Sequence, residues 1–325
     1  MTTASSGLPR LRSRNGTPSA ALAGEVGNGR DMVGPEISEQ SRAGTAAAEY
    51  WSQHHVDAPD GGFASEEHSL AHYAWRNSIY LGYLESMPVS DADGKVIVDF
   101  GCGPGNDLVG FGHFSRPARL IGIDVSRQVL SLAERRLALH RIQAELICTG
   151  QTCGLPLDSG SVDLVHCSGV LMHLPNPEKA LGEFKRILRR DGYAQVMVYH
   201  YDSLWMHLYV AYVKMLVEAR YAGLTKQEAF TRSTDGEDCP ISTAYRFEEF
   251  AELAVAAGLR CEFAGVSIST TEMKLLPDRF AALEDKRLDS ESRECLYELR
   301  FSDRGLPTYR GRVAGINLAC RLYPC

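Results

Sequence analysis

The chain has 325 residues, 44% of them hydrophobic, and a formal net charge of −7. This composition supplies a sizeable core, and the length suits either one α/β domain with additions or two domains. Lys and Arg form no run that follows a phosphate backbone, which argues against a nucleic-acid partner. Without an apolar stretch of 18 residues, a secretory leader or zinc-type cysteine spacing, we expect a cytoplasmic protein with reduced thiols and no membrane span.

The N-terminal part of the chain divides into two segments. Residues 1–43 are rich in Gly, Ser, Thr, Ala and Pro without apolar periodicity, which predicts a disordered segment. Residues 44–90 are predicted to form a helical cap. In this cap, one helix covers residues 46–55, and a longer helix begins at Ser65 and stops before Pro88.

A short strand followed by three glycines comes next. The strand carries Asp99 near its end, and a second apolar run further along the chain ends in Asp124. The three glycines are Gly101, Gly103 and Gly105. Glycines let a ligand approach the backbone, and an acid about 20 residues further on, at the end of the next strand, accepts hydrogen bonds from ribose hydroxyls. The pattern therefore predicts a nucleoside site.

The residues around the glycines distinguish between two kinds of cofactor. A dinucleotide site needs G-x-G-x-x-G with its pyrophosphate at the helix N-terminus, but Asn106 stands where the third glycine of that pattern belongs. Asp99 and Asp107 flank the loop, and two acids favour a cationic ligand over a diphosphate. S-adenosylmethionine, with its sulfonium and ammonium groups, is such a ligand.

The following residues alternate between strand and helix. Strands are expected at residues 144–148, 162–167 and 194–199, and helices at residues 125–140 and 177–188. Parallel strands joined by crossovers of this length form an open, doubly wound α/β sheet with ligands at the carboxyl ends of the strands.

After these strands the alternation is interrupted. Residues 203–245 are predicted to form a helical insertion, placed where a lid over the substrate belongs. Regular structure then resumes, and residues 313–323 are expected to form an antiparallel closing strand. We therefore predict a core made of residues 91–202 and 246–325.

Several of these segments together resemble a known family. VDFGCGPGND followed by IGIDVS is similar to the class I S-adenosylmethionine-dependent methyltransferases, in particular the type 11 group. The resemblance extends from Lys95 to Tyr199 and includes residues 155–158, 161–165, 169–174 and 188–192. It implies a Rossmann-like, seven-stranded fold and S-adenosylmethionine as the cofactor.

The resemblance also implies roles for individual residues. Asp124 is expected to hold the ribose, Val125 to flank the adenine, and the glycine loop to lie under the methionine part. Gln151 stands where many relatives have an acid near the adenine amino group, and its side-chain carbonyl can accept the same hydrogen bond. The cofactor-binding candidates are Asp99, Gly101, Cys102, Gly103, Gly105, Asp124, Val125, Gln151, Thr152 and Ser168.

Two histidines are candidates for catalysis. Methyl transfer from a sulfonium is an in-line displacement, so the protein mainly aligns the acceptor and excludes water. A base is needed only if the acceptor loses a proton early, and His173 and His200 follow the ends of central strands, although each also suits core packing. Metal-dependent O-methyltransferases place an acid after the fourth strand, whereas Asp163 lies at its beginning, so we expect no metal.

The acceptor is less well defined than the cofactor. No Asn-Pro-Pro-Tyr or Asp-Pro-Pro-Tyr motif is present, which argues against a nucleobase acceptor. Candidate substrate contacts, each of which also suits packing, are Trp75, Arg76, Tyr199, Tyr201 and Trp205. We expect a methyltransferase that acts on a small molecule or a glycan precursor. The alternatives are a non-catalytic S-adenosylmethionine-binding protein and, less favoured, an NAD-dependent oxidoreductase; the acceptor atom and the oligomeric state stay open.

Overall fold

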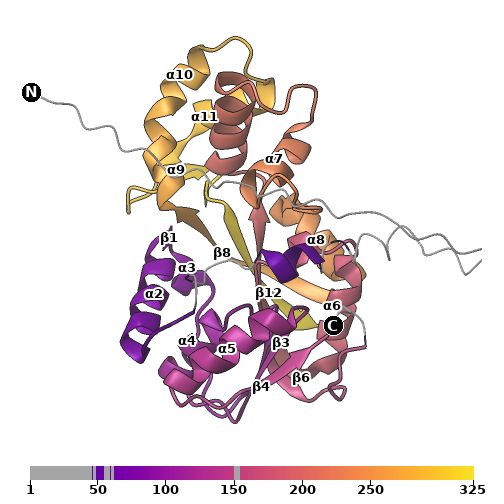
Figure 1. Cartoon of the computed structure of the whole chain (residues 1–325). Coiled ribbons are helices and arrows are strands. Elements are labelled where there is room, and N and C mark those ends of the chain that lie inside the picture. Colours follow the sequence, from indigo (N-terminus) through magenta and orange to yellow (C-terminus); the bar gives the residue numbers. More distant parts are fainter. Residues whose placement is uncertain (1–45, 47–48, 55–58, 60–61, 150–153) are drawn as a thin grey trace, which may run out of the picture. The chain divides into compact units, whose positions relative to one another are not determined.

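The computed structural model describes residues 46, 49–54, 59, 62–149 and 154–325 (Figure 1). The expectations for residues 1–43, for Gln151 and for Thr152 lie outside the described residues. Among the described residues, no helix combines the length and the apolar character that a membrane crossing requires.

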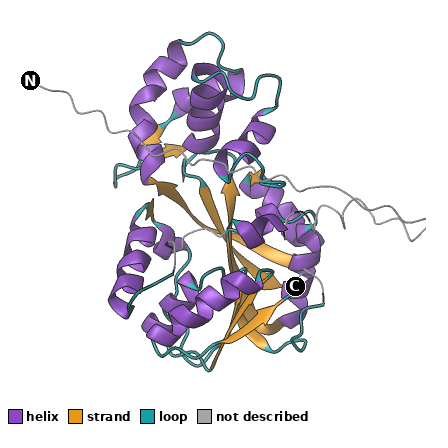
Figure 2. Cartoon of the chain, in the orientation of Figure 1, coloured by secondary structure: helices purple, strands orange, loops and turns teal. Residues whose placement is uncertain are grey.

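A nine-stranded sheet forms the centre of the described residues (Figure 2). Five neighbouring strands are parallel and lie in the order β4-β3-β2-β5-β6. Their bounds are β2 (Val96–Phe100), β3 (Arg119–Asp124), β4 (Glu145–Cys148), β5 (Val162–Ser168) and β6 (Leu188–His200). β12 (Asn317–Pro324) lies antiparallel between β6 and β8 (Leu259–Ser269). These seven strands confirm the predicted Rossmann-like, doubly wound sheet and its antiparallel closing strand.

Two short strands extend this sheet. β1 (Tyr80–Leu81) pairs with β8, and β7 (Ala244–Tyr245) pairs with the end of β6. Through these strands the N-terminal cap and the helical insertion are both hydrogen-bonded to the sheet near the carboxyl end of β6.

Helices cover both faces of the sheet because successive residues of its central strands are both apolar. Ile97 packs with Leu108 on one face, and the next residue, Val98, packs with Phe184 and Phe250 on the other. The first face carries α2 (Glu66–Ser78), α4 (Asn106–Phe114) and α5 (Arg127–Leu139), and the second carries α6 (Pro177–Ile187) and α8 (Phe247–Ala256). A short helix, α3 (Tyr83–Ser86), follows β1.

The ends of these helices follow from local sequence. The side chain of Ser65 accepts a hydrogen bond from His68 N at the start of α2, and Ser126 does the same for Val129 N at the start of α5. α6 has Pro177 at its first position, where the missing N–H is not needed. Local side-chain and backbone chemistry therefore determines where these three helices begin.

The predicted insertion, residues 203–245, is largely helical in the structure. It contains a π-helix, η2 (Trp205–Val217), and α7 (Lys226–Thr234). The part between β8 and β12 adds α9 (Thr270–Leu275), η3 (Leu276–Asp278), α10 (Arg279–Glu284), α11 (Ser290–Glu298), β9 (Arg300–Phe301), β10 (Pro307–Tyr309) and β11 (Arg312–Val313).

The predicted core segment 246–325 thus contains a further group of helices and short strands between β8 and β12. Leu204 and Leu208 at the start of the insertion share one hydrophobic cluster with Leu296 and Leu299 of the later segment. Apolar contacts of this kind join the two segments although they are far apart in sequence. We propose that residues 203–245 and 270–313 form one cap.

Candidate active site

The glycine loop leaves β2 in a backbone conformation that side chains disfavour. Gly101, Gly103 and Gly105 have φ values of +76°, +52° and +79°. A Cβ on Gly101 would lie 2.2 Å from Cγ2 of Val170, whereas a Cβ on Gly103 would meet no atom of the described residues within 4 Å. Gly101 is thus required by packing against the protein, while Gly103 faces space that a ligand can occupy.

The two positions predict different outcomes for the same substitution. We expect Gly101→Ala to lower the free energy of unfolding by roughly 2–4 kcal/mol, because the left-handed backbone and the contact with Val170 both oppose a Cβ. Gly103→Ala should lower the free energy of unfolding by only about 1 kcal/mol, but it should weaken cofactor binding about 10-fold or more. Thermal unfolding and calorimetry with S-adenosylhomocysteine measure the two effects; unchanged affinity in Gly103→Ala would contradict this placement of the ligand.

Asp124, at the end of β3, is tied to the glycine loop. Its carboxylate accepts hydrogen bonds from the N–H groups of Gly103 and Ser126, each at 3.0 Å. Burial raises the pKa of this carboxyl, partly offset by these N–H donors. Because each carboxylate oxygen has more than one lone pair, both can also accept from ribose hydroxyls.

Asp99 is a buried acid at the end of the neighbouring strand. It is 3% exposed, and none of the hydrogen bonds among the described residues ends on its side chain. Burial raises the pKa of Asp99 to about 7. His166, which pairs with Asp99 on the neighbouring strand β5, opposes this rise. A buried carboxylate without a protein donor is suited to a cationic ligand group.

A polar network lies next to Asp99. Gln195 donates from Nε2 to Nδ1 of His166 at 2.6 Å, and Nε2 of His166 therefore carries the proton that Asp107 Oδ2 accepts at 3.2 Å. Tyr83 contacts Asp107 Oδ2 at 3.1 Å and Ser168 Oγ at 2.8 Å. The network joins the N-terminal cap to β5, β6 and α4, beside the glycine loop.

Arg76 completes this network from α2. Its Nη1 lies 3.8 Å from Oδ1 of Asp107, and its guanidinium stacks 4.4 Å from the ring centre of Tyr83. Burial by itself would raise the pKa of Asp107, but Arg76 and His166 outweigh it and hold the pKa well below its usual range. The structure therefore places Arg76 against Asp107. Its neighbour Trp75 is 53% exposed and belongs to a different face of α2.

His173 lies in a second cluster of side chains, one helical turn beyond Val170, the residue that contacts the glycine loop. Val170, which packs against Gly101, leads directly into η1 (Leu171–His173). His173 is buried, and its Nδ1 donates to the carbonyl oxygen of Ile241 at 2.8 Å, so Nε2 is the unprotonated nitrogen of the neutral ring. Burial lowers the pKa of His173 below its ordinary value.

Residues from β6, from the helical insertion and from the N-terminal helical segment surround this histidine. The ring of Tyr199 lies 5.7 Å from that of His173, and the Tyr199 hydroxyl donates to Oδ1 of Asp235 at 2.7 Å. Ser242 holds the other oxygen of Asp235 at 2.8 Å. From the N-terminal helical segment, the ring of Trp51 lies 4.6 Å from His173. These contacts make an aromatic and polar enclosure that the sequence did not predict as a unit.

The remaining candidates lie elsewhere. His200 follows Tyr199 on β6 and so faces the other side of the sheet, where its Nδ1 donates to Gly315 O at 3.1 Å. Burial lowers the pKa of His200 to about 4. Tyr201 donates to Glu291 and Trp205 donates to Thr234, so both take part in contacts within the cap. The structure does not bring these three residues to His173.

Some site residues were missed at the sequence level. His166 was detectable, since it is an imidazole among the otherwise apolar residues 164–167 in the middle of a strand. Tyr83, Trp51 and Asp235 gave no such signal, because nothing in the local pattern shows what a cap residue or a loop residue will contact.

The fold and the site define the class of the domain. A doubly wound sheet with a left-handed glycine loop at one strand end and an acid at the next is a nucleoside-binding α/β domain. Residues 98–196 match the family described as "Methyltransferase domain". This region is a class I S-adenosylmethionine-dependent methyltransferase domain, as the resemblance in sequence implied.

Individual relatives are similar over part of their length. An uncharacterized 37.1 kDa protein in transposon TN4556 of Streptomyces fradiae is 36% identical over 183 residues, covering 56% of this chain and 46% of the relative. A ubiquinone biosynthesis O-methyltransferase of Azoarcus sp. is 33% identical over 99 residues, 30% of this chain and 42% of the enzyme. The chain thus spans less than half the length of these relatives.

A solved structure gives a more distant likeness. A S-adenosylmethionine-dependent methyltransferase from Thermotoga maritima, described as a possible histamine N-methyltransferase, is 16% identical with a TM-score of 0.44. The comparison covers 80% of this chain and 97% of that chain.

Proposed function

We propose that this protein transfers a methyl group from S-adenosylmethionine to a hydroxyl of a small molecule or a glycan precursor. The observation that carries the proposal is the unprotonated Nε2 of His173, buried in an enclosure one turn from the glycine loop. A neutral imidazole in that position suits an acceptor that must lose a proton.

The residues present fit the cofactor. Asp124 would hold the ribose, Asp99 would face the ammonium group, and the open side of Gly103 leaves room for the ligand backbone. S-adenosylmethionine supplies an activated methyl group when bound. Tyr83 and Ser168, which are hydrogen-bonded to each other, would close the site on the side of the N-terminal cap.

The acceptor site is proposed to lie between His173, Tyr199 and Trp51. Aromatic rings on two sides exclude water and pack against an apolar acceptor body, while His173 Nε2 receives the hydroxyl proton. Asp235 holds Tyr199 in place and lies close enough to His173 to oppose the lowering of its pKa. His200 is not part of this proposal, because its ring lies on the other side of the sheet.

A screen with labelled cofactor tests the proposed function. The full chain is incubated with S-adenosylmethionine labelled in the methyl group and with matched panels of phenols, sugar hydroxyls, carboxylates and amines. We expect label in the hydroxyl panels. Transfer only to amines or carboxylates would contradict the acceptor assignment, and cofactor binding without transfer in any panel would favour the non-catalytic binding protein.

The raised pKa of Asp99 predicts that cofactor binding depends on pH. Its pKa is raised to about 7 in the free protein, so near neutral pH part of the population carries a protonated carboxyl that cannot pair with an ammonium group. We expect affinity for S-adenosylhomocysteine to rise about 10-fold between pH 6 and pH 8. Calorimetry should show weaker and nearly pH-independent binding in Asp99→Asn. A retained pH dependence in that variant would assign the effect to another group.

A further inference from the structure

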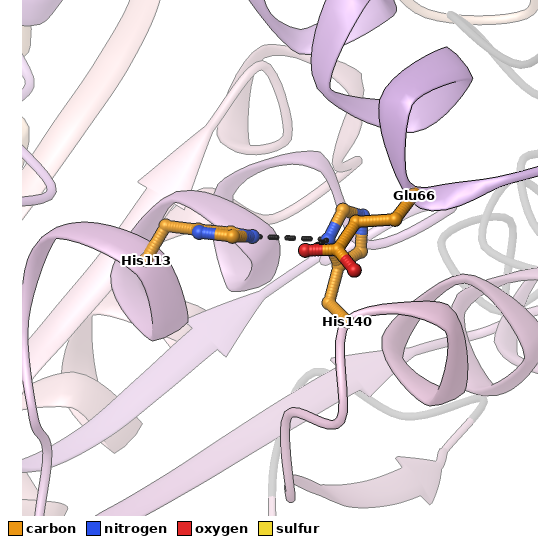
Figure 3. A group of neighbouring side chains, drawn as sticks. All are labelled: Glu66, His113 and His140. Atoms are coloured by element: carbon orange, nitrogen blue, oxygen red, sulfur yellow. Dashed lines mark hydrogen bonds and ion pairs between the residues drawn. The ribbon is translucent and has the colours of Figure 1, made fainter.

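Three potential metal ligands meet outside the methyl-transfer site (Figure 3). Glu66 is the first residue of α2, His113 lies in the last turn of α4, and His140 directly follows α5. One ligand atom from each lies within 4.8 Å of the other two. Nε2 of His113 is 2.9 Å from Nδ1 of His140, which is 3.8 Å from Oε1 of Glu66.

A second contact orients the buried member of this group. Nε2 of His140 lies 2.8 Å from Oγ of Ser69, and Ser69 is itself held by the guanidinium of Arg136 at 2.7 Å. When Ser69 accepts the proton on Nε2, the lone pair of Nδ1 points toward His113 and Glu66. Metal-binding histidines usually have such a partner on the second ring nitrogen, which fixes the tautomer and the ring.

The donor set selects the kind of ion. Two imidazole nitrogens and one carboxylate oxygen suit Zn²⁺ and related transition metals, whereas Mg²⁺ and Ca²⁺ prefer oxygen ligands. His113 is exposed and Glu66 is half-buried, so water can complete the coordination. We propose that Glu66, His113 and His140 bind a divalent transition metal ion of the zinc type.

The charges near the three ligands determine how strongly the site should bind a metal ion. Glu66 supplies one negative charge to the group, and the buried Arg136 cation lies behind Ser69. Repulsion between Arg136 and the ion lowers affinity. We therefore expect binding in the micromolar range, weaker than at a structural zinc site with thiolate ligands.

The position of this site connects it to the cofactor loops. α4 begins directly after Gly105, and α5 begins directly after its cap residue Ser126, which lies two residues beyond Asp124. An ion at the other ends of these helices would fix α2, which carries Arg76 to Asp107, against both of them. Metal binding should therefore favour the arrangement that holds the cofactor, a consequence that rests on the proposed function.

The experiment uses the full chain after treatment with a chelator. Co²⁺ alone is titrated, visible absorption is recorded, and Zn²⁺ is then added as a competitor. Since substitution of the buried His140 can unfold the protein, the test variants are His113→Gln and Glu66→Gln at the more exposed positions. We expect one equivalent to bind the wild type with micromolar affinity and at least 10-fold weaker binding in both variants.

Two control variants test whether metal ions bind at this site or at other side chains. His68→Gln removes an exposed histidine of the same helix and should leave binding unchanged. Cys239→Ser removes a possible ligand from the other histidine cluster, that of His173 and Asp235, and should also leave binding unchanged.

The outcomes distinguish the metal site from the proposed function. Wild-type affinity in His113→Gln, or loss of the Co²⁺ spectrum in Cys239→Ser, would overturn the proposed metal site. Zinc should raise the melting temperature of the wild type by several degrees and that of His113→Gln by less. If zinc binds but affinity for S-adenosylhomocysteine does not change, the metal site holds and its link to the cofactor loops is refuted.

Discussion

Asp124→Asn is expected to weaken binding of S-adenosylmethionine and S-adenosylhomocysteine at least 100-fold while leaving the protein folded. The native carboxylate accepts from the N–H groups of Gly103 and Ser126 and, in the proposed complex, from the ribose. Asparagine offers one oxygen in place of two and carries no charge. Losing two charge-assisted hydrogen bonds costs roughly 3 kcal/mol, which corresponds to about a 100-fold change in affinity.

The comparison requires a matched acid outside the site. Asp158 is exposed, and only its backbone carbonyl makes a hydrogen bond among the described residues, so Asp158→Asn serves as the control. Calorimetry gives the affinity of each variant and thermal unfolding shows whether each is folded. Equal binding by the wild type and Asp124→Asn would refute the role of Asp124. If the wild type binds neither compound, the cofactor assignment itself is lost.

His173→Asn is expected to lower kcat with a hydroxyl acceptor by about 10²–10⁴-fold without changing cofactor affinity. The asparagine amide can still donate to Ile241 O, so the loop stays attached while the basic nitrogen is removed. A purely structural role for His173 would instead change stability or affinity and leave the rate of the bound enzyme largely intact.

The pH profile gives an independent measurement for the same residue. Burial lowers the pKa of His173, so the ring is neutral at pH 7 and becomes protonated only in more acidic solution. The rate in the wild type should therefore rise with pH in the acidic range, below the ordinary pKa of histidine, and level off at higher pH. This rise should be absent in His173→Asn. His200→Asn is the comparison, since His200 is equally buried but faces the other side of the sheet. Similar rate losses in both variants would point to a general effect of cavity formation.

The cofactor half of the site was predictable from sequence because its parts are local. Three glycines within five residues fix one turn, and apolar runs on either side define the strands that end at Asp99 and Asp124. The carboxyl ends of neighbouring parallel strands lie at the same edge of a sheet, so those two acids must come together. The roles given to Gln151 and Thr152 stay predictions, since both residues lie outside the described part of the chain.

The acceptor half was not predictable in the same way. Tyr199 was predicted as a substrate contact together with Tyr201 and Trp205, because all three are aromatic and close in sequence. Only the structure shows that the ring of Tyr199 lies 5.7 Å from that of His173. β6 turns successive side chains to opposite faces, which separates Tyr199 from His200, and the later residues enter the cap. Trp51 and Asp235 reach His173 from two segments that have no pairing signal in the sequence.

The sequence by itself determined the sheet, the glycine loop and the class of cofactor, because periodicity and short spacings act over one or two neighbouring elements. Only the tertiary structure decided which side chains meet across elements: Asp107 with His166, Asp235 with Tyr199, and Glu66 with His113 and His140. Such contacts depend on how the helices pack on the sheet. The helices pack through their apolar faces, and no local sequence pattern shows where this packing places the polar residues at the helix ends.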